Sequence, residues 1–469
     1  MRKSMTITLS IAILTASAAS LSCSSALVER GLSTIVIQTS PPVGRSLSGG
    51  WTMGEGTLPN FSSITVTIRG AGRDPVVGTF DDPSGAVSLT VRPGSGLSVS
   101  VSATPDWEAT AVRYPDAQLP VLVSGYSGGA VVDAPANGTV SATVSLAPAT
   151  TRIPVPNPNG DWQLGVAAGL SSGSLETYEL PDLTTDSHVA FDKSGLLYVS
   201  MYGNVGVFGA ALDNPYDTVQ FENDVLDFAL CSATNRVYGV YSSNSFYFVR
   251  FVDLDDAEPT ATDMSAMDAY QIQQGGIAVD ALGYLYVPAY ELSTEASGIL
   301  RFSVDDTATA TTIAFASFEE LGLGYFTGLI NTIVQDMTIA NGVLVVALSE
   351  IDAYYGISAD LLTGRGMIVG IEPNSLKRLW TCGELDELSP NYPDDPVAQL
   401  YGPRRFLAVS PKRLYVLDAG FSWSGEAADP LKNEMRVVAV NLETGAIAET
   451  GLNGQVDYFE TDYSTYYMC

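Results

Sequence analysis

A short pattern recurs along the second half of this chain and constrains its fold more than any other feature. The clearest copy, residues 276–287, reads Gly-Ile-Ala-Val-Asp-Ala-Leu-Gly-Tyr-Leu-Tyr-Val. β-forming residues flank a centre that holds Asp280 and Gly283, so the pattern predicts a strand, a tight turn and a second strand. Related copies span residues 188–199, 228–240, 337–345 and 406–416. Copies at intervals of roughly 40 to 70 residues predict one supersecondary unit repeated, with connections of varying length.

Each unit carries further apolar segments that predict two more strands, as residues 298–302 and 312–315 do in the third copy. The pattern A-V-D-x-x-G-x-L-Y-V resembles that of NHL and YVTN-type propellers, and this resemblance implies a β-propeller over residues 161–469. Residues 163–180 supply later strands of a sixth unit. We expect residues 455–459 to provide its missing strand and close a ring of six blades, with five or seven blades as alternatives.

The first part of the chain has a different character. Residues 33–148 are rich in Ser, Thr, Val and Gly and alternate apolar with polar residues over several short segments, which predicts an antiparallel β-sandwich. In pattern, this region resembles the immunoglobulin-like and transthyretin-like modules of bacterial surface proteins. Residues 149–160 contain three prolines and predict a stiff linker between the two domains. The predicted fold class is therefore all-β, a sandwich followed by a propeller.

The N-terminus has the pattern of an export signal. A basic start, Met1-Arg2-Lys3, precedes an apolar segment and small residues that end directly before Cys23. This arrangement resembles the lipobox of bacterial lipoproteins, in the relaxed form seen in spirochaetes, since Ser20 stands where Leu is common. The resemblance implies a signal peptide over residues 1–22, lipidation of Cys23 and a tether over residues 23–32. The alternative is an ordinary cleaved signal peptide.

These features place the protein in the cell envelope, in the periplasm or at the outer membrane or cell surface, held to the membrane only by its N-terminal lipid. The charge balance excludes other partners. The chain has 52 Asp and Glu against 22 Lys and Arg, a formal net charge of -30. Binding to nucleic acid or docking on anionic lipid needs clustered Lys and Arg, so neither is expected.

Polar residues stand where the predicted inner strands begin and where second strands end. In propellers these positions share one face and surround the channel mouth, so we expect a polar pocket there. The candidates are Asp186, His188, Asp227, Asp336, Glu350, Arg405 and Asp418. Propeller lactonases of the gluconolactonase type use such side chains to hold a divalent metal that activates water, although no specific lactonase motif is visible in this sequence. The commoner role of acids at loop ends is to cap turns, and the single His excludes a Ser/His/Asp triad in practice.

Two long insertions follow predicted second strands, at residues 349–365 and 418–435, and are expected to lie on the same face. With the segment at 389–395 they carry exposed aromatic and acidic candidates for a binding face: Tyr354, Tyr355, Phe421, Trp423, Tyr392 and Asp352. Rings supply contact area and carboxylates accept hydroxyl hydrogen bonds, which suits a protein or a glycan. The alternative is that these rings pack beneath their own loops.

The sequence therefore favours a binding or scaffold module for protein or glycan, without catalysis and without a cofactor. A divalent cation is the one cofactor left open, and a metal-dependent lactonase or hydrolase at the channel mouth is the alternative function. A third hypothesis is a passive surface antigen or spacer.

Overall fold

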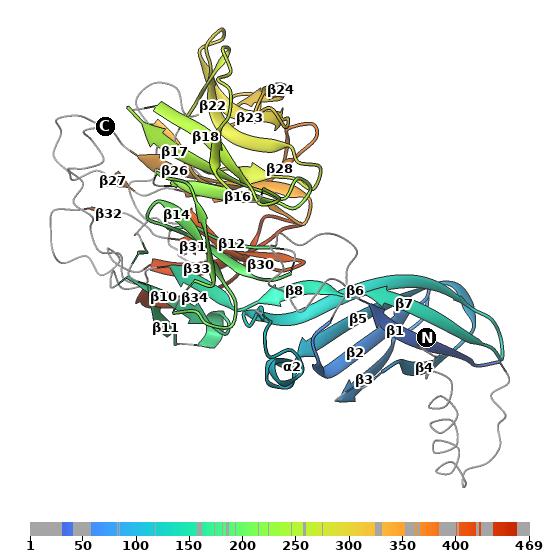
Figure 1. Cartoon of the computed structure of the whole chain (residues 1–469). Coiled ribbons are helices and arrows are strands. Elements are labelled where there is room, and N and C mark those ends of the chain that lie inside the picture. Colours follow the sequence, from blue (N-terminus) through green and yellow to red (C-terminus); the bar gives the residue numbers. More distant parts are fainter. Residues whose placement is uncertain are drawn as a thin grey trace.

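The structure, a computed structural model, is built almost entirely from β-strands (Figure 1). It describes residues 31–40, 58–156, 162–323, 331–351, 362–363, 366–383, 400, 403–418, 422–423 and 435–456, except residues 82, 84, 118, 173, 181, 184–186, 193, 214, 224, 245, 257–258 and 274. The expected signal peptide, Cys23 and most of the tether lie outside these residues. None of the helices in the described part of the chain is long and apolar enough to cross a membrane.

Two sheets sharing one apolar core form the N-terminal sandwich. The smaller sheet, in the order β4-β1-β7, contains β1 (Ser33–Ser40), β4 (Val87–Val91) and β7 (Thr139–Ser145). The larger sheet, in the order β3-β2-β5-β6-β8, contains β2 (Phe61–Arg69), β3 (Val76–Asp81), β5 (Gly94–Pro105), β6 (Val123–Ala134) and β8 (Ala147–Thr151). Alternate residues point into the core, as Leu97, Val99 and Val101 of β5 do, because side chains of a strand alternate between the faces of its sheet.

One strand pair of the sandwich differs from the antiparallel prediction. β1 pairs with β4 in the antiparallel sense but with β7 in the parallel sense, from Thr34 opposite Thr139 to Ser40 opposite Ser145. Alternation along a strand records which face is buried and carries no information about the direction of the neighbouring strand. A short helix, α2 (Trp107–Arg113), was also not expected; the Asp106 carboxylate caps it by accepting from the Ala109 N–H.

Six further sheets of three to five strands follow in sequence order in the described part of the chain, and we call them blades one to six. Blade one contains β9 (Ile153–Pro156), β10 (Gln163–Ala167) and β11 (Glu176–Glu179). Blade two contains β12 (Val189–Phe191), β13 (Leu197–Met201), β14 (Asn204–Phe208) and β15 (Asp217–Gln220). Blade three contains β16 (Asp227–Cys231), β17 (Arg236–Ser243), β18 (Phe246–Asp253) and β19 (Ala261–Asp263).

Blade four has its inner strand in two pieces that both pair with β22. It contains β20 (Tyr270–Ile272), β21 (Ala278–Val279), β22 (Leu285–Glu291), β23 (Ala296–Val304) and β24 (Ala310–Ser317). Blade five contains β25 (Asn331–Ala340), β26 (Val343–Ile351), β28 (Gly366–Glu372) and β29 (Lys377–Cys382). Blade six contains β30 (Pro403–Val409), β31 (Arg413–Asp418), β33 (Met435–Asn441) and β34 (Ile447–Val456).

Apolar cores between neighbouring blades close these sheets into a ring, so the fold is a six-bladed β-propeller. Blade one packs against blade two through residues such as Leu164 and Phe208. On its other side, blade one packs against blade six through residues such as Ile153 and Val437. The same kind of core joins each remaining pair of consecutive blades.

The ring closes differently from the sequence-based expectation. Gln455 and Val456 belong to β34, which pairs with β33 inside blade six and not with blade one; residues 457–459 lie outside the described part. Blade one keeps three strands within the described residues, and the apolar core beside blade six joins the two blades. The approach is close, since a Cβ on Gly451 would lie 2.2 Å from the Leu170 carbonyl oxygen.

The described part of the expected linker, residues 149–156, is strand apart from Arg152. β8 ends at Thr151 and β9 begins at Ile153, so only Arg152 separates the sandwich from blade one, and its N–H donates to the Leu122 carbonyl at 2.7 Å. Pro154 and Pro156 are buried in β9, which pairs only with β10. Because the two prolines are spaced by two residues, their missing N–H groups fall on the side of β9 that faces away from β10.

We expect Leu164→Ala to destabilise the propeller by about 2–5 kcal/mol, because it leaves a cavity between blades one and two. Leu164 is 0 % exposed. The measurement is the free energy of unfolding in urea, and the matched control is Leu282→Ala, whose side chain is 75 % exposed. Equal effects of the two substitutions would contradict closure of the ring by side-chain packing.

Candidate functional site: the central channel

The inner strands of blades two to six share one repeated position, which is occupied by four residue types. It lies at or near the start of the strand in blades two, three and six, between the two pieces of the strand in blade four, and inside β25 in blade five. The position precedes the segments Val-Ala-Phe, Phe-Ala-Leu, Ile-Ala-Val, Met-Thr-Ile and Phe-Leu-Ala. Its occupants in chain order are His188, Asp227, Gly276, Asp336 and Arg405. Because the blades repeat one unit around an axis, these residues reach the same level of the channel.

The two aspartates at this level each bind two blades. The Asp227 carboxylate accepts from the N–H of Phe228 at 2.7 Å in its own strand and from the N–H of Ile277 in blade four at 2.8 Å. The Asp336 carboxylate joins blades five and six in the same way. It accepts from Met337 at 2.7 Å and from Phe406 of blade six at 2.6 Å. Each carboxylate thus supplies an acceptor for N–H groups of two neighbouring inner strands.

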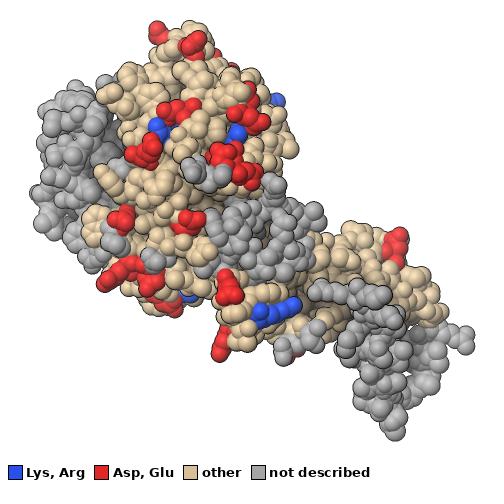
Figure 2. Space-filling model, in the orientation of Figure 1, with Lys and Arg blue, Asp and Glu red and all other residues tan. Residues whose placement is uncertain are grey.

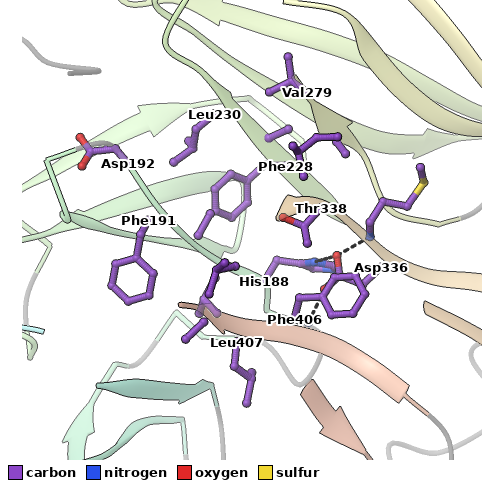
Figure 3. Close-up of a pocket in the computed structure, with 18 of the residues that line it drawn as sticks. His188, Phe191, Asp192, Phe228, Leu230, Val279, Asp336, Thr338, Phe406 and Leu407 are labelled. Atoms are coloured by element: carbon purple, nitrogen blue, oxygen red, sulfur yellow. Dashed lines mark hydrogen bonds and ion pairs between the residues drawn. The ribbon is translucent and has the colours of Figure 1, made fainter. Parts of the chain in front are cut away.

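His188 joins the two aspartates across the channel. Its Nδ1 lies 2.7 Å from Asp227 Oδ1 and 3.7 Å from Asp336 Oδ1, and its side chain is 5 % exposed. Figure 3 shows the imidazole and the Asp336 carboxylate pointing toward one another. The backbone N–H of His188 donates to Ser200 Oγ at 2.7 Å, which fixes the start of the strand. We call His188, Asp227 and Asp336 the polar ring.

Burial governs the ionisation of the polar ring. Burial raises the pKa of Asp227 to about 8, against the opposing hydrogen bond from Ile277 and the charge of Arg405. Burial, and then the charge of Asp227, raises the pKa of Asp336 to about 7, while His188 and Arg405 act in the opposite direction. The Arg405 guanidinium is held in place by donating to the carbonyls of Gln335 and Arg404.

Glycine at the blade-four position makes room for this network. A Cβ on Gly276 would lie 2.3 Å from the Met337 nitrogen and 2.8 Å from Asp227 Oδ2. Both distances are far below van der Waals contact, so a side chain at this position would displace the polar ring or the backbone of blade five.

A pocket of about 290 Å³ occupies the channel beside the polar ring. The polar ring lines it, and the walls come from the inner strands of blades two to six, including Phe228, Met337 and Phe406. Figure 3 shows the rings of Phe191 and Phe228, and Thr338 near His188. At the other end the pocket is lined by Asp192 and by Pro148, Ala149 and Thr151 of the sandwich. The channel therefore offers an apolar cavity between a polar network and the second domain.

Asp192 is buried with one oxygen engaged and the other not. Its Oδ1 accepts from Ser194 and from the N–H of Leu196, whereas its Oδ2 has no hydrogen-bond partner among the described residues. Burial raises its pKa to about 6. The equivalent aspartate of blade four, Asp280, uses both oxygens, because its Oδ2 accepts from the Tyr286 hydroxyl at 2.9 Å.

Of the polar residues expected at the channel mouth, the structure brings His188, Asp227 and Asp336 together, with Arg405 acting on both carboxylates. Asp418 lies elsewhere: it is fully buried in blade six, where its Oδ2 is 2.9 Å from Nε of Arg436 on the paired strand. Glu350 lies in β26, where its backbone is opposite Thr332; the structure describes only its backbone. Asp186 also lies outside the described residues.

The expected aromatic face falls mostly outside the described residues, which do not include Tyr354, Tyr355, Phe421, Tyr392 or Asp352. The structure does connect the two long insertions. β27 (Leu362–Thr363) pairs with β32 (Ser422–Trp423), with Leu362 opposite Trp423 (Figure 1). This ladder links the insertion that follows the second strand of blade five with the one that follows the second strand of blade six.

Sequence reasoning missed two contributors to the site. It named no candidate before the inner strand of blade four, where the position equivalent to His188 is Gly276. It also gave no role to Ser200, which lies in the second strand and reaches the backbone of His188. Aligning the repeats on the residue before each inner strand would have identified Gly276, whereas no local signal marks Ser200.

The polar ring is also the set of described residues whose spacing meets the needs of a metal ion. One ligand atom from each of its three residues lies within 4.8 Å of the others, and no second group of this kind occurs among the described residues. However, each of the four carboxylate oxygens already accepts a backbone N–H. The arrangement supplies two carboxylates and one imidazole, fewer oxygens than a hard divalent ion prefers.

Comparisons with known proteins assign no family. No known protein family matches the sequence, and no curated protein is similar to it. Solved structures resemble this chain only at low identity and low TM-score. TolB from Acinetobacter baumannii is 9 % identical with a TM-score of 0.37, over 78 % of this chain and 79 % of that one. Hydrazine synthase from Kuenenia stuttgartiensis is 11 % identical with a TM-score of 0.37, over 63 % of this chain and 84 % of that one. A protein of unknown function from Bacteroides caccae is 13 % identical with a TM-score of 0.27, over 58 % and 94 %.

Gly276→Ala is expected to destabilise the protein by about 1–3 kcal/mol or more, because its Cβ would overlap the backbone of blade five and the carboxylate of Asp227. Gly85→Ala is the control, since a Cβ there would meet nothing within 4 Å. Urea unfolding of both variants provides the comparison. A Gly276→Ala protein as stable as the control variant would show that the polar ring is not close-packed.

Asp192→Asn is expected to become increasingly stabilising, relative to the parent protein, as the pH rises. Because its pKa is raised, the stability that the protonated Asp192 gives the folded protein is fully present below about pH 4. This stability is lost as the pH rises through about 6. Asn cannot ionise, and its carbonyl can take the place of Oδ1. The difference in unfolding free energy between variant and parent should therefore grow by about 2 kcal/mol between pH 4 and pH 8.

Asp280→Asn is the matched control at the same position of another blade. It removes the carboxylate that serves the Tyr286 hydroxyl and lies 3.9 Å from Arg301, so it should lower the unfolding free energy at neutral pH. Unfolding curves at pH 4, 6 and 8 test both variants. A difference for Asp192→Asn that does not change with pH would rule out ionisation of a buried Asp192.

Proposed function

We propose that this chain is an exported, lipid-anchored binding module of the cell envelope, in which the propeller presents a loop surface to a protein or glycan partner. The observation that carries the proposal is the β27–β32 ladder. Propeller blades need no strand pairing between the connections of neighbouring blades. A ladder between two long insertions is what a composite binding surface requires, because it fixes one insertion relative to the other.

The composition of this surface supports a protein or glycan. The insertions and the segment at 389–395 carry Tyr354, Tyr355, Tyr392, Phe421 and Trp423 with Asp352. Aromatic side chains dominate the energetics of protein interfaces and also stack on sugar rings. Figure 2 shows Asp and Glu side chains spread over one face of the propeller with few Lys and Arg, which agrees with the expectation that nucleic acid is not the partner.

The N-terminal sequence supports the anchoring. A basic start, an apolar segment and small residues before Cys23 are the features of a lipoprotein signal, and acylation of Cys23 would hold the mature chain at a membrane. The sandwich would then stand between the anchor and the propeller, in the periplasm or at the outer membrane or cell surface.

A metal-dependent hydrolase or lactonase is the second candidate, and the spacing of His188, Asp227 and Asp336 favours it. Three points of geometry favour binding without catalysis. The carboxylate oxygens are committed to backbone N–H groups, the imidazole is 2.7 Å from a carboxylate, and both aspartates join neighbouring blades. Elemental analysis of the purified chain distinguishes the two, since a hydrolase would retain about one equivalent of a divalent metal.

Crosslinking in cells tests the proposed function. We expect the tagged full chain to capture a reproducible protein or glycan-bearing partner, and Trp423→Ala to reduce the yield by about tenfold or more, as for a central aromatic of an interface. Trp162→Ala is the matched control, because Trp162 is an exposed tryptophan next to β10 of blade one and belongs to neither insertion. A partner captured equally by both variants would locate the interface elsewhere, and no partner would contradict the scaffold function.

A further inference from the structure

The channel pocket combines an apolar wall with ionisable side chains that are mostly acidic. Inner-strand residues such as Phe228, Ile277 and Phe406 form most of its lining. The polar ring closes one end, and Asp192 stands at the other. This is a separate site from the insertions on blades five and six, and it does not depend on the proposed envelope partner.

The charges that line the pocket favour a cation. Its described ionisable residues are three aspartates and one histidine, with no Lys or Arg among the described lining. The nearest positive charge of the site, Arg405, is not part of the described lining, and its Nη1 donates to two backbone carbonyls. An anion entering the pocket would therefore meet carboxylates in the lining, whereas the charge of Arg405, which acts on both Asp227 and Asp336, lies outside it.

The lining also distinguishes between kinds of cation. A divalent metal needs several free oxygen ligands and water, whereas each oxygen of Asp227 and Asp336 already accepts a backbone N–H. An organic ammonium group needs only a remaining lone pair on each acceptor. Its positive charge favours the ionised form of Asp227 and Asp336, whose pKa burial raises, and in that form the carboxylates only accept. Its carbon body would lie against the apolar wall, and aromatic faces attract cations.

We propose that this pocket binds a small protonated amine with an alkyl or aryl body, its ammonium group directed to His188, Asp227 and Asp336. The pocket volume of about 290 Å³ suits a small molecule. The ammonium group donates to the carboxylates at the polar end, and the carbon chain extends toward the sandwich.

Titration calorimetry of the full chain with hexylamine, 1-hexanol and hexanoate tests the head group at constant chain length. We expect hexylamine to bind at least about tenfold more tightly than 1-hexanol, and hexanoate not to bind. Equal affinity for amine and alcohol would overturn the proposal, because it would show that the cavity does not discriminate between a charged and a neutral head group. Binding of Mn²⁺ or Zn²⁺ alone that blocks the amine would also overturn it, in favour of a metal site.

Two variants locate the binding. Thr338→Phe fills the pocket from blade five and should abolish hexylamine binding, whereas Thr312→Phe, at an exposed position of blade four, should not change it. Asp336→Asn should weaken hexylamine binding about tenfold without changing the affinity for 1-hexanol. Thr338→Phe keeps the test valid if Asp336→Asn does not fold, and retained amine binding by a folded Thr338→Phe protein would place the site elsewhere.

Discussion

Burial of both faces of every blade is the constraint on which this propeller depends. The second strands are buried on both sides, as β13 (Leu197–Met201) is at all five of its residues. Such a sheet cannot be stable alone in water, because both faces would expose apolar side chains. Each blade therefore needs a neighbour on either side, and a ring is the arrangement in which every blade has two. The three-stranded blade one satisfies this requirement by packing between blades two and six.

The polar ring solves a second problem that the closed fold creates. Inner strands run along the channel, where buried backbone N–H groups have little access to water. Asp227 and Asp336 each accept from two such groups in neighbouring blades, and His188 lies between the two carboxylates. Desolvating these groups is unfavourable, and their raised pKa values express that cost. The same groups give the pocket its polarity, so the features that organise the channel also define what it can bind.

The sequence predicted the blades well because their signal is local. Alternation, turn residues and the repeated Asp and Gly place most of the strands, and Asp280 and Gly283 occupy the turn that the pattern implies. The predictions that failed concerned pairings between segments that are distant in sequence. The parallel pairing of β1 with β7, the place of residues 455 and 456 in blade six and the strand character of Pro154 and Pro156 all depend on which segment lies alongside. For the site, equivalent positions in the repeat brought His188, Asp227 and Asp336 together, whereas Asp418 paired with Arg436 because register within one sheet placed them opposite each other.

The single residue between β8 and β9 also has a mechanical consequence. A flexible linker would absorb tension as slack, but here the last strand of the sandwich continues into the first strand of blade one with Arg152 alone between them. Tension along the chain from the N-terminal side would pass through the ladder of β6 with β8 and then load the ladder of β9 with β10. The seam between blades one and six, which is joined by side chains, would then be the first part of the ring to carry that load.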